Sequence, residues 1–147
     1  MRFKFKTSLL TIVIVAILSG LTVSGLLNTS KVLQSSGSVK AINVEVYWDN
    51  NCTQVVNAVD WGTPDPGDDV NTTVYIRNSG TASMNLSLTT SSWTPAEAAN
   101  YITLSWDREG FVLNADEVTQ AVLTLSVSDM ISGIVDFSFN IVIEGTG

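Results

Sequence analysis

The chain contains no histidine and a single cysteine among its 147 residues. Histidine is the side chain that most often acts as a general base near neutral pH, so its absence removes the commonest acid–base catalyst. Cys52 therefore lacks a histidine to activate it as a nucleophile. The acidic turn at Asp65, Asp68 and Asp69 does not have EF-hand spacing and is expected to be solvated. We predict a protein that is not an enzyme and that binds no cofactor or metal.

Basic residues are also scarce, with seven Lys and Arg against 14 Asp and Glu. Three of the seven, Arg2, Lys4 and Lys6, lie at the extreme N-terminus. If that end is removed, the remaining surface is strongly acidic. Such a surface repels nucleic acid and anionic lipid headgroups, which excludes both as partners of the mature domain.

Because Cys52 is the only cysteine, an internal disulfide cannot form. One interpretation is a small, partly buried thiol. The other is an intermolecular disulfide in a secreted oligomer. The exposure of Cys52 distinguishes them.

The first 25 residues have the pattern of an export signal. Residues 1–6 are basic, and residues 7–30 carry no charge and include a continuous apolar run. Small residues favour cleavage after Gly25, with Gly20 as the second choice. The alternative is an uncleaved membrane anchor, since roughly twenty apolar residues cross a bilayer. Both interpretations place the following domain outside the cell.

Residues 26–37 are mostly polar and precede the domain, but they include two apolar pairs, Leu26 with Leu27 and Val32 with Leu33. One interpretation is a flexible spacer. The other is a donor arm that adds as a strand to the sheet of a neighbouring subunit.

Residues 38–147 show the alternation of short β-strands. Apolar residues recur at every second position and face Ser, Thr, Asn and Asp on the opposite side. Turn residues separate the segments, and none shows sustained helical periodicity. We predict an all-β fold: an antiparallel, immunoglobulin-like β-sandwich of seven to eight strands. The expected strands are 39–48, 55–61, 70–76, 84–88, 101–106, 111–113, 118–127 and 135–143.

The tryptophans divide into two groups. Trp48 and Trp106 share the parity of the apolar rows and are expected in the core. Trp93 lies in a Thr/Ser-rich connection, residues 89–100, and is expected to be exposed as a possible ligand contact. Within this connection, Pro95 at a helix start predicts one helical turn over residues 95–99.

Four Asn-x-Ser/Thr sequons occur, at Asn28, Asn51, Asn71 and Asn85. In an exported domain these are candidate glycosylation sites, and Asn51 and Asn71 lie in or beside predicted turns.

The order of turns and strands carries a resemblance. Pro66-Gly67-Asp68 precedes a strand, Asn78-Ser79-Gly80-Thr81 follows it, and residues 123–127 form a later alternating strand. This pattern resembles the immunoglobulin-like modules of secreted archaeal and bacterial surface proteins. More narrowly, it resembles the TasA/camelysin family of biofilm-matrix fibre subunits and the archaeal bundling pilins. That resemblance implies polymerisation in which the mature N-terminus, here residues 26–36, completes the sheet of the next subunit.

These features together predict a secreted or cell-surface protein. The expected function is that of a structural subunit of a surface or extracellular-matrix filament, assembled by N-terminal strand addition. Its expected partners are further copies of the chain or other cell-surface proteins. Contact with the membrane is expected only through an uncleaved N-terminal segment. The alternative is an adhesion or carbohydrate-binding module that uses Trp93.

Overall fold

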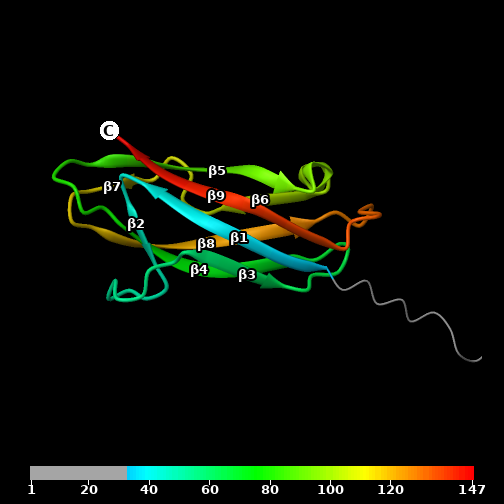
Figure 1. The fold of residues 1–147 in the computed structure, drawn as a ribbon. Helices are drawn as coiled ribbons and strands as arrows, with labels where there is room; N and C mark the ends of the chain where they lie inside the picture. The colour runs from blue at the N-terminus through cyan, green and yellow to red at the C-terminus, as the bar shows by residue number, and fades with distance from the viewer. Residues whose placement is uncertain (1–32) are drawn as a thin grey trace, which may run out of the picture. The chain divides into compact units, whose positions relative to one another are not determined.

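The computed structural model describes residues 33–147, and this part of the chain forms two β-sheets (Figure 1). Sheet A has the strand order β3-β1-β9-β5-β7, and sheet B has the order β2-β4-β8-β6. A single 3₁₀ turn, η1 (Ala96–Asn100), follows β5 within the described range. The strands are β1 (Gln34–Ile42), β2 (Glu45–Tyr47), β3 (Ala58–Gly62), β4 (Asp69–Arg77), β5 (Met84–Thr94), β6 (Ile102–Trp106), β7 (Val112–Leu113), β8 (Val118–Val127) and β9 (Asp136–Thr146).

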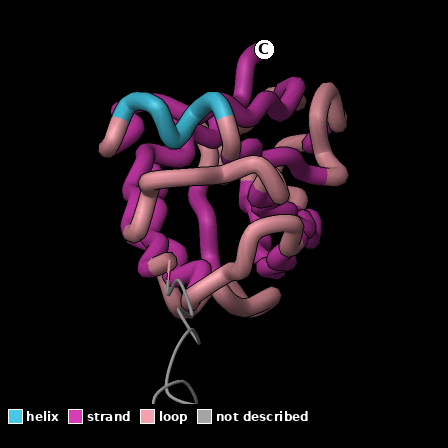
Figure 2. The backbone as a smooth tube through the Cα atoms, turned by 90° about the vertical axis from the view of Figure 1, so that its right-hand side faces the viewer, coloured by secondary structure: helices cyan, strands magenta, loops and turns pink. Residues whose placement is uncertain are grey.

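The two sheets enclose one hydrophobic core to which both contribute. Alternate residues of β8 and β9 point inward, as their sequence pattern predicts. Figure 2 views the domain from the end at which β1 begins, with η1 in cyan. The expected all-β, two-sheet architecture is therefore confirmed. The most deeply buried inward side chains of β8 and β9 are Ala121, Leu123, Leu125, Ile141 and Ile143.

One strand pair is parallel, so the expectation of wholly antiparallel sheets is wrong at this place. β1 runs parallel to β9 from the pair Gln34 and Asp136 to the pair Ile42 and Glu144. Parallel neighbours require a long crossover connection. Here β2 to β8 together form that connection, because β1 is the first strand of the domain and β9 the last.

A second difference concerns the segment 39–48, which was expected to be one strand. It divides into the end of β1 and β2 at Asn43, whose φ of 61° lies in the left-handed region that asparagine tolerates. The Asn43 side chain donates a hydrogen bond to the Gly145 carbonyl at 3.1 Å. The chain thereby passes from sheet A to sheet B. Beyond the break, Trp48 follows β2 and is 37% exposed, so the prediction that it lies in the core is wrong.

The connection expected over residues 89–100 is shorter in the structure. β5 continues to Thr94. The sequence pattern does not indicate this second half of the strand, because residues 89–92 are all Thr or Ser and show no alternation of apolar and polar side chains. The helical turn expected at 95–99 is confirmed as η1, displaced by one residue. β5 is therefore the longest strand of sheet A together with β9, at 11 residues each.

Candidate functional site

The candidate site is the position of β1 between β3 and β9 in sheet A, which we call the β1 slot. β1 pairs with β9 along its whole length and with β3 through Ser35, Ser36, Gly37 and Ser38. The first strand of the domain is thus hydrogen-bonded on both sides (Figure 1). A strand in this position is held by backbone bonds that any chain with the same spacing could supply.

The inner face of β1 fits closely against the core. Leu33, just before the strand, is fully buried, and Ser35 is 6% exposed while its hydroxyl donates to the Gly62 carbonyl at 3.1 Å. At Gly37, an added Cβ would lie 2.9 Å from Ile141 Cδ1 and 3.3 Å from Trp61 Nε1. The slot therefore accepts a strand with a small residue at its centre.

Trp61 fills the space that the missing side chain of Gly37 leaves. Its ring is only 3% exposed, and its Nε1 finds no hydrogen-bond partner among residues 33–147. An unsatisfied buried N–H costs about 1–3 kcal/mol. Packing against β1 evidently outweighs that cost, so the fit between Trp61 and Gly37 is a feature of the slot.

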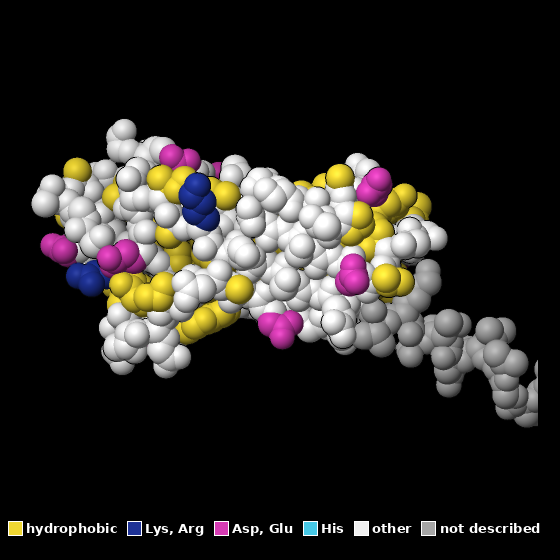
Figure 3. All heavy atoms as spheres, viewed as in Figure 1, with side chains coloured by type: hydrophobic (Ala, Val, Ile, Leu, Met, Phe, Trp, Pro, Cys, Tyr) yellow, Lys and Arg dark blue, Asp and Glu magenta, His cyan; other side chains and the backbone are white. Residues whose placement is uncertain are grey.

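The outer face of β1 is polar, and Lys40 is the one charged side chain of this strand. Ser36 and Ser38 are exposed, and their neighbours on β9 are Ser138 and Asn140. Most of the middle of the face seen in Figure 3 is correspondingly white, with charged groups scattered around it and along its edges. Hydroxyl and amide groups thus dominate this surface.

A groove of about 770 Å³ lies at the beginning of β1, between the start of β9 and the end of β3. Its lining includes Gln34, Asp60, Thr94, Asp136 and Phe137. The exposed carboxylates of Asp60 and Asp136 and the amide of Gln34 can together bind a polar ligand by hydrogen bonds, whereas Phe137 is only 3% exposed. Within the described residues, no three metal-binding side chains converge as a metal site would require.

The residues of the predicted donor arm are divided by the structure. Leu33 is buried in the core of its own domain, and residues 34–36 belong to β1 in its own sheet. Leu26, Leu27 and Val32 lie outside the described residues. The sandwich therefore includes residues before 38, and the segment that occupies the β1 slot extends from Leu33 to Ile42.

Trp93 packs against the core and is not the freely exposed side chain that the sequence predicted. Its ring stacks on Phe139 with 4.1 Å between centroids and 11° between planes. Its Nε1 donates to Thr90 Oγ1 at 3.3 Å, and the side chain is half-buried. One face of the ring is therefore already occupied, which limits any role in binding a ligand.

The three described sequon asparagines are all exposed. Asn51 lies in the loop after β2, and Asn85 lies on β5. Asn71 on β4 accepts a hydrogen bond from Thr124 Oγ1 at 2.7 Å. Asn28 lies outside the described residues.

Cys52 lies in the same loop as Asn51, with a φ of 57° and intermediate exposure. Its thiol donates weakly to the Asn50 carbonyl at 3.8 Å. The side chain is therefore partly accessible, and both interpretations of this cysteine stay open.

Residues 48–57 connect β2 with β3 and cover the side of the sandwich next to β1. The Val39 N–H donates to the Asn57 carbonyl at 2.9 Å, and the Val56 N–H donates to the Val46 carbonyl at 2.9 Å. Because the connection bonds to strands of both sheets, it closes this side of the domain. We call it the closed side.

Asp49 organises the beginning of this connection. Its carboxylate accepts hydrogen bonds from the Gln54 N–H at 2.8 Å and from the N–H and hydroxyl of Thr53. Partial desolvation by itself would raise the pKa of Asp49, but these hydrogen bonds outweigh it and lower the pKa below its ordinary value of 3.8. The charged form of Asp49 therefore stabilises the connection.

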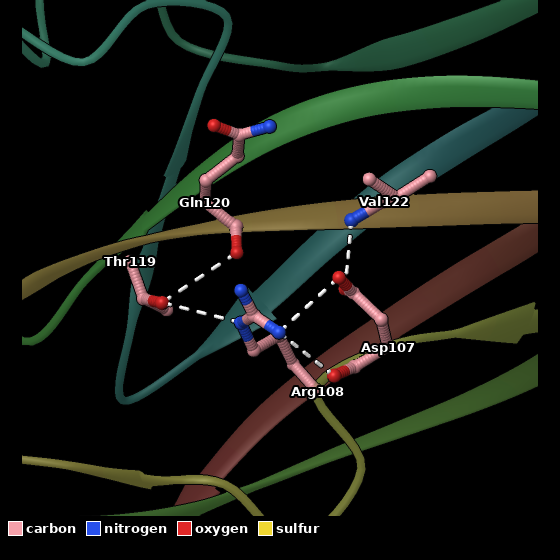
Figure 4. Close-up of polar contacts among 5 residues, drawn as sticks. All are labelled: Asp107, Arg108, Thr119, Gln120 and Val122. Carbon is pink, nitrogen blue, oxygen red and sulfur yellow. Dashed lines mark hydrogen bonds and ion pairs between the residues drawn. The ribbon is translucent and has the colours of Figure 1, made fainter.

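A turn that the sequence showed only as polar joins β6 to β7 (Figure 4). Asp107 accepts a hydrogen bond from the Val122 N–H at 2.8 Å and forms an ion pair with Arg108 at 3.1 Å. The Arg108 guanidinium also donates to Thr119 Oγ1 and lies 5.3 Å from the centre of the Phe111 ring. These contacts fix the turn against β8 and so set the position of the next residue, Glu109.

Among residues 33–147, no helix is long and apolar enough to cross a membrane. No protein-family model matches the chain, and no curated protein matches its sequence.

Proposed function

We propose that the chain is an exported structural subunit of a cell-surface or extracellular-matrix filament, built on an immunoglobulin-like sandwich and assembled by exchange of β1. The observation that carries the proposal is the position of β1, the first strand of the described domain, between β3 and β9 in sheet A. A first strand at this place can be replaced by the same strand of another copy, and the sheet remains complete.

Exchange of β1 conserves nearly all of its contacts. A strand from a second copy would form the same pairs with β9 and β3 and would present the same Gly37 to Trp61 and Ile141. The net change in free energy is therefore small, apart from the change at the link to β2. That link is a short break at Asn43, which leaves sheet A for sheet B.

Repeated exchange favours an open filament rather than a closed pair. Each copy gives its strand through one surface and receives another through a different surface, which is a heterologous contact. The export pattern of residues 1–25 supports the same function, because it directs the domain to the place where such filaments form. The exchanged segment, Leu33–Ile42, lies directly after it.

A pair of cysteines can report which copy supplies β1. Ser38 and Ala58 face each other across β1 and β3, and both are exposed. In a Cys52→Ser background, Ser38→Cys with Ala58→Cys should form covalent ladders when exported protein is oxidised after assembly. The measurement is a non-reducing gel together with electron microscopy of the same sample.

The same variant oxidised before assembly provides the control, since a disulfide within one copy holds β1 in its own sheet and should prevent filaments. Either of two results would overturn the proposal. In the first, concentrated protein forms no filaments and its oxidation yields only monomers; in the second, filaments still form after β1 has been locked.

The groove beside β1 favours a second candidate, an adhesion or carbohydrate-binding module. Asp60, Asp136 and Gln34 line it, and their carboxylates and amide are suited to the hydroxyl groups of a sugar. Binding to a glycan array that is lost in Asp60→Asn, but kept in the distant Asp116→Asn, would favour this function. The same array with Trp93→Phe tests the contact predicted from the sequence.

A further inference from the structure

β5 differs from the other long strands of sheet A because much of its outer edge, the edge away from β9, has no strand beside it. β7 pairs only with Met84 and Asn85, and the turn after β6 bonds to Leu86. Beyond Leu88, no other strand of the described domain pairs with this edge. Unpaired edges of this kind offer backbone groups to another strand.

A side chain covers the first free donor of that edge. Glu109 Oε2 accepts a hydrogen bond from the Leu88 N–H at 3.1 Å and another from Trp106 Nε1 at 2.8 Å. Both contacts are exposed to solvent, so a backbone carbonyl could replace the carboxylate at little cost. The next residue whose backbone points the same way is Thr90, by the alternation of an antiparallel strand.

The composition of β5 indicates what can pair with it. Its 11 residues include no charged side chain, in a chain with 14 acidic residues. β2 and β3, the edges on the closed side, carry Glu45 and Asp60. Like charges directly opposite each other destabilise a strand pair. When β5 pairs with β5 of a second copy, no like charges lie opposite each other, because the strand has no charged side chain.

We infer that the free edge of β5 pairs antiparallel with β5 of a second copy, centred on Thr89. In this register Leu88 of one copy lies opposite Thr90 of the other, and both turn their backbone groups towards the partner. The two Thr89 side chains then face each other on the outer surface of sheet A, where Thr89 is exposed. Paired threonines are favourable cross-strand neighbours.

This contact goes beyond the exchange of β1, because it uses the opposite region of sheet A and is symmetric. A symmetric contact joins two copies and then stops, whereas strand exchange continues from copy to copy. The β5 contact would therefore link two filaments side by side, or form dimers of copies whose β1 stays in its own sheet.

Charge substitutions at Thr89 test both the contact and its register. The background is exported protein in which β1 is locked by the disulfide of the Ser38→Cys, Ala58→Cys variant. In it, Thr89→Lys alone and Thr89→Glu alone should each weaken dimerisation about fivefold or more. An equimolar mixture of the two variants should restore it, since opposite charges then face each other. Analytical ultracentrifugation gives the dissociation constants.

The matched control is the same pair of substitutions at Thr73, which is exposed on β4 of sheet B. Equal effects at Thr73 and Thr89, or a mixture that dimerises no better than either variant, would overturn the inference. So would a wild-type protein that stays monomeric at every concentration measured.

A single cysteine separates this contact from strand exchange. In a Cys52→Ser background with no other cysteine, Thr89→Cys should oxidise to covalent dimers at least about fivefold faster than Thr73→Cys, because residues at a non-hydrogen-bonded pair lie close together. With one cysteine in each copy the covalent product can only be a dimer. The result of this experiment is therefore independent of whether the β1 experiment yields ladders. Equal oxidation rates at the two positions would contradict the β5 contact and leave the β1 proposal unaffected.

Discussion

The two lateral sides of the sandwich are built differently. On the closed side, residues 48–57 bond to β1 and β2, and the short edge strands β2 and β3 each carry an acidic side chain. On the other side, which we call the open side, the edges of β5 and β6 carry no charge at all. The cover there is the turn after β6, and Glu109 is its contact with the Leu88 N–H. The closed side is thus covered by backbone hydrogen bonds, whereas on the open side backbone bonds reach only to Leu86 and a side chain covers Leu88.

The difference indicates where the molecule can associate. Charged, short and covered edges prevent unwanted pairing, and an uncharged long edge permits it. The closed side is also the side next to the β1 slot, so its backbone bonds hold the frame into which β1 fits. The open side has no such task.

The largest effect is expected for the tryptophans of the two sides. Trp61→Ala on β3 should lower the free energy of unfolding by about 3–5 kcal/mol, because the ring is almost completely buried against Gly37. Trp106→Ala, half-buried on β6, should lower it by about 1–2 kcal/mol. Urea denaturation measures both. Equal losses would show that the two sides contribute alike to stability.

The next effect tests the fit inside the β1 slot. Gly37→Ala should destabilise the domain by about 1–3 kcal/mol, because its Cβ would lie 2.9 Å from Ile141 Cδ1. Ser38→Ala, on the outer face of the same strand, is the control and should change stability by less than about 0.5 kcal/mol. Thermal denaturation followed by circular dichroism distinguishes them. A stable Gly37→Ala variant would mean that β1 is loosely held.

A smaller effect is expected at the open side. Glu109→Ala removes the acceptor of the Leu88 N–H and of Trp106 Nε1, which should cost about 1 kcal/mol. Hydrogen exchange of the Leu88 amide should accelerate, while that of the Val39 amide on the closed side should not change. Glu97→Ala, an exposed residue of η1, controls for the lost charge. Unchanged exchange at Leu88 would show that the carboxylate does not cover this edge.

The smallest effect is the pH dependence of the closed side. Because the folded pKa of Asp49 is lowered, its carboxylate stabilises the fold above the unfolded pKa, and this contribution is lost as the pH falls through the folded value. The difference in Tm between wild type and Asp49→Ala should therefore be constant near neutral pH and should shrink below pH 3.8. Thr53→Ala, which removes only the hydroxyl donor and keeps the backbone N–H groups of residues 53 and 54, should retain most of that dependence. A difference that does not vary with pH would exclude the carboxylate as its source.

Much of the fold could be predicted from the sequence, because period-two alternation directly reports which side of a strand is buried. The inward rows of β4, β8 and most of β9 follow that pattern. It failed where the backbone changes direction. The left-handed Asn43 splits the first expected strand, and Val135, expected on an inward row, precedes β9 and is 61% exposed.

The site was harder to predict, because strand order does not follow from alternation. Residues 34–37, Gln-Ser-Ser-Gly, include no apolar residue and belong to the segment that the sequence predicts to be a spacer or a donor arm. Its place inside sheet A, between β3 and β9, depends on the buried Leu33 and on Gly37, which leaves room for Trp61. The sequence likewise gives no indication of the role of Glu109, since its hydrogen bond to the Leu88 N–H spans 21 positions of sequence.

The parallel arrangement of β1 and β9 has a mechanical consequence. β1 begins at one end of sheet A, and β9 finishes at the other. Tension applied between Leu33 and Gly147 would load the hydrogen bonds between these strands in shear, so that they share the force instead of breaking one after another. The first and last strands of the described domain thus form a mechanical clamp that resists force applied along the strand direction.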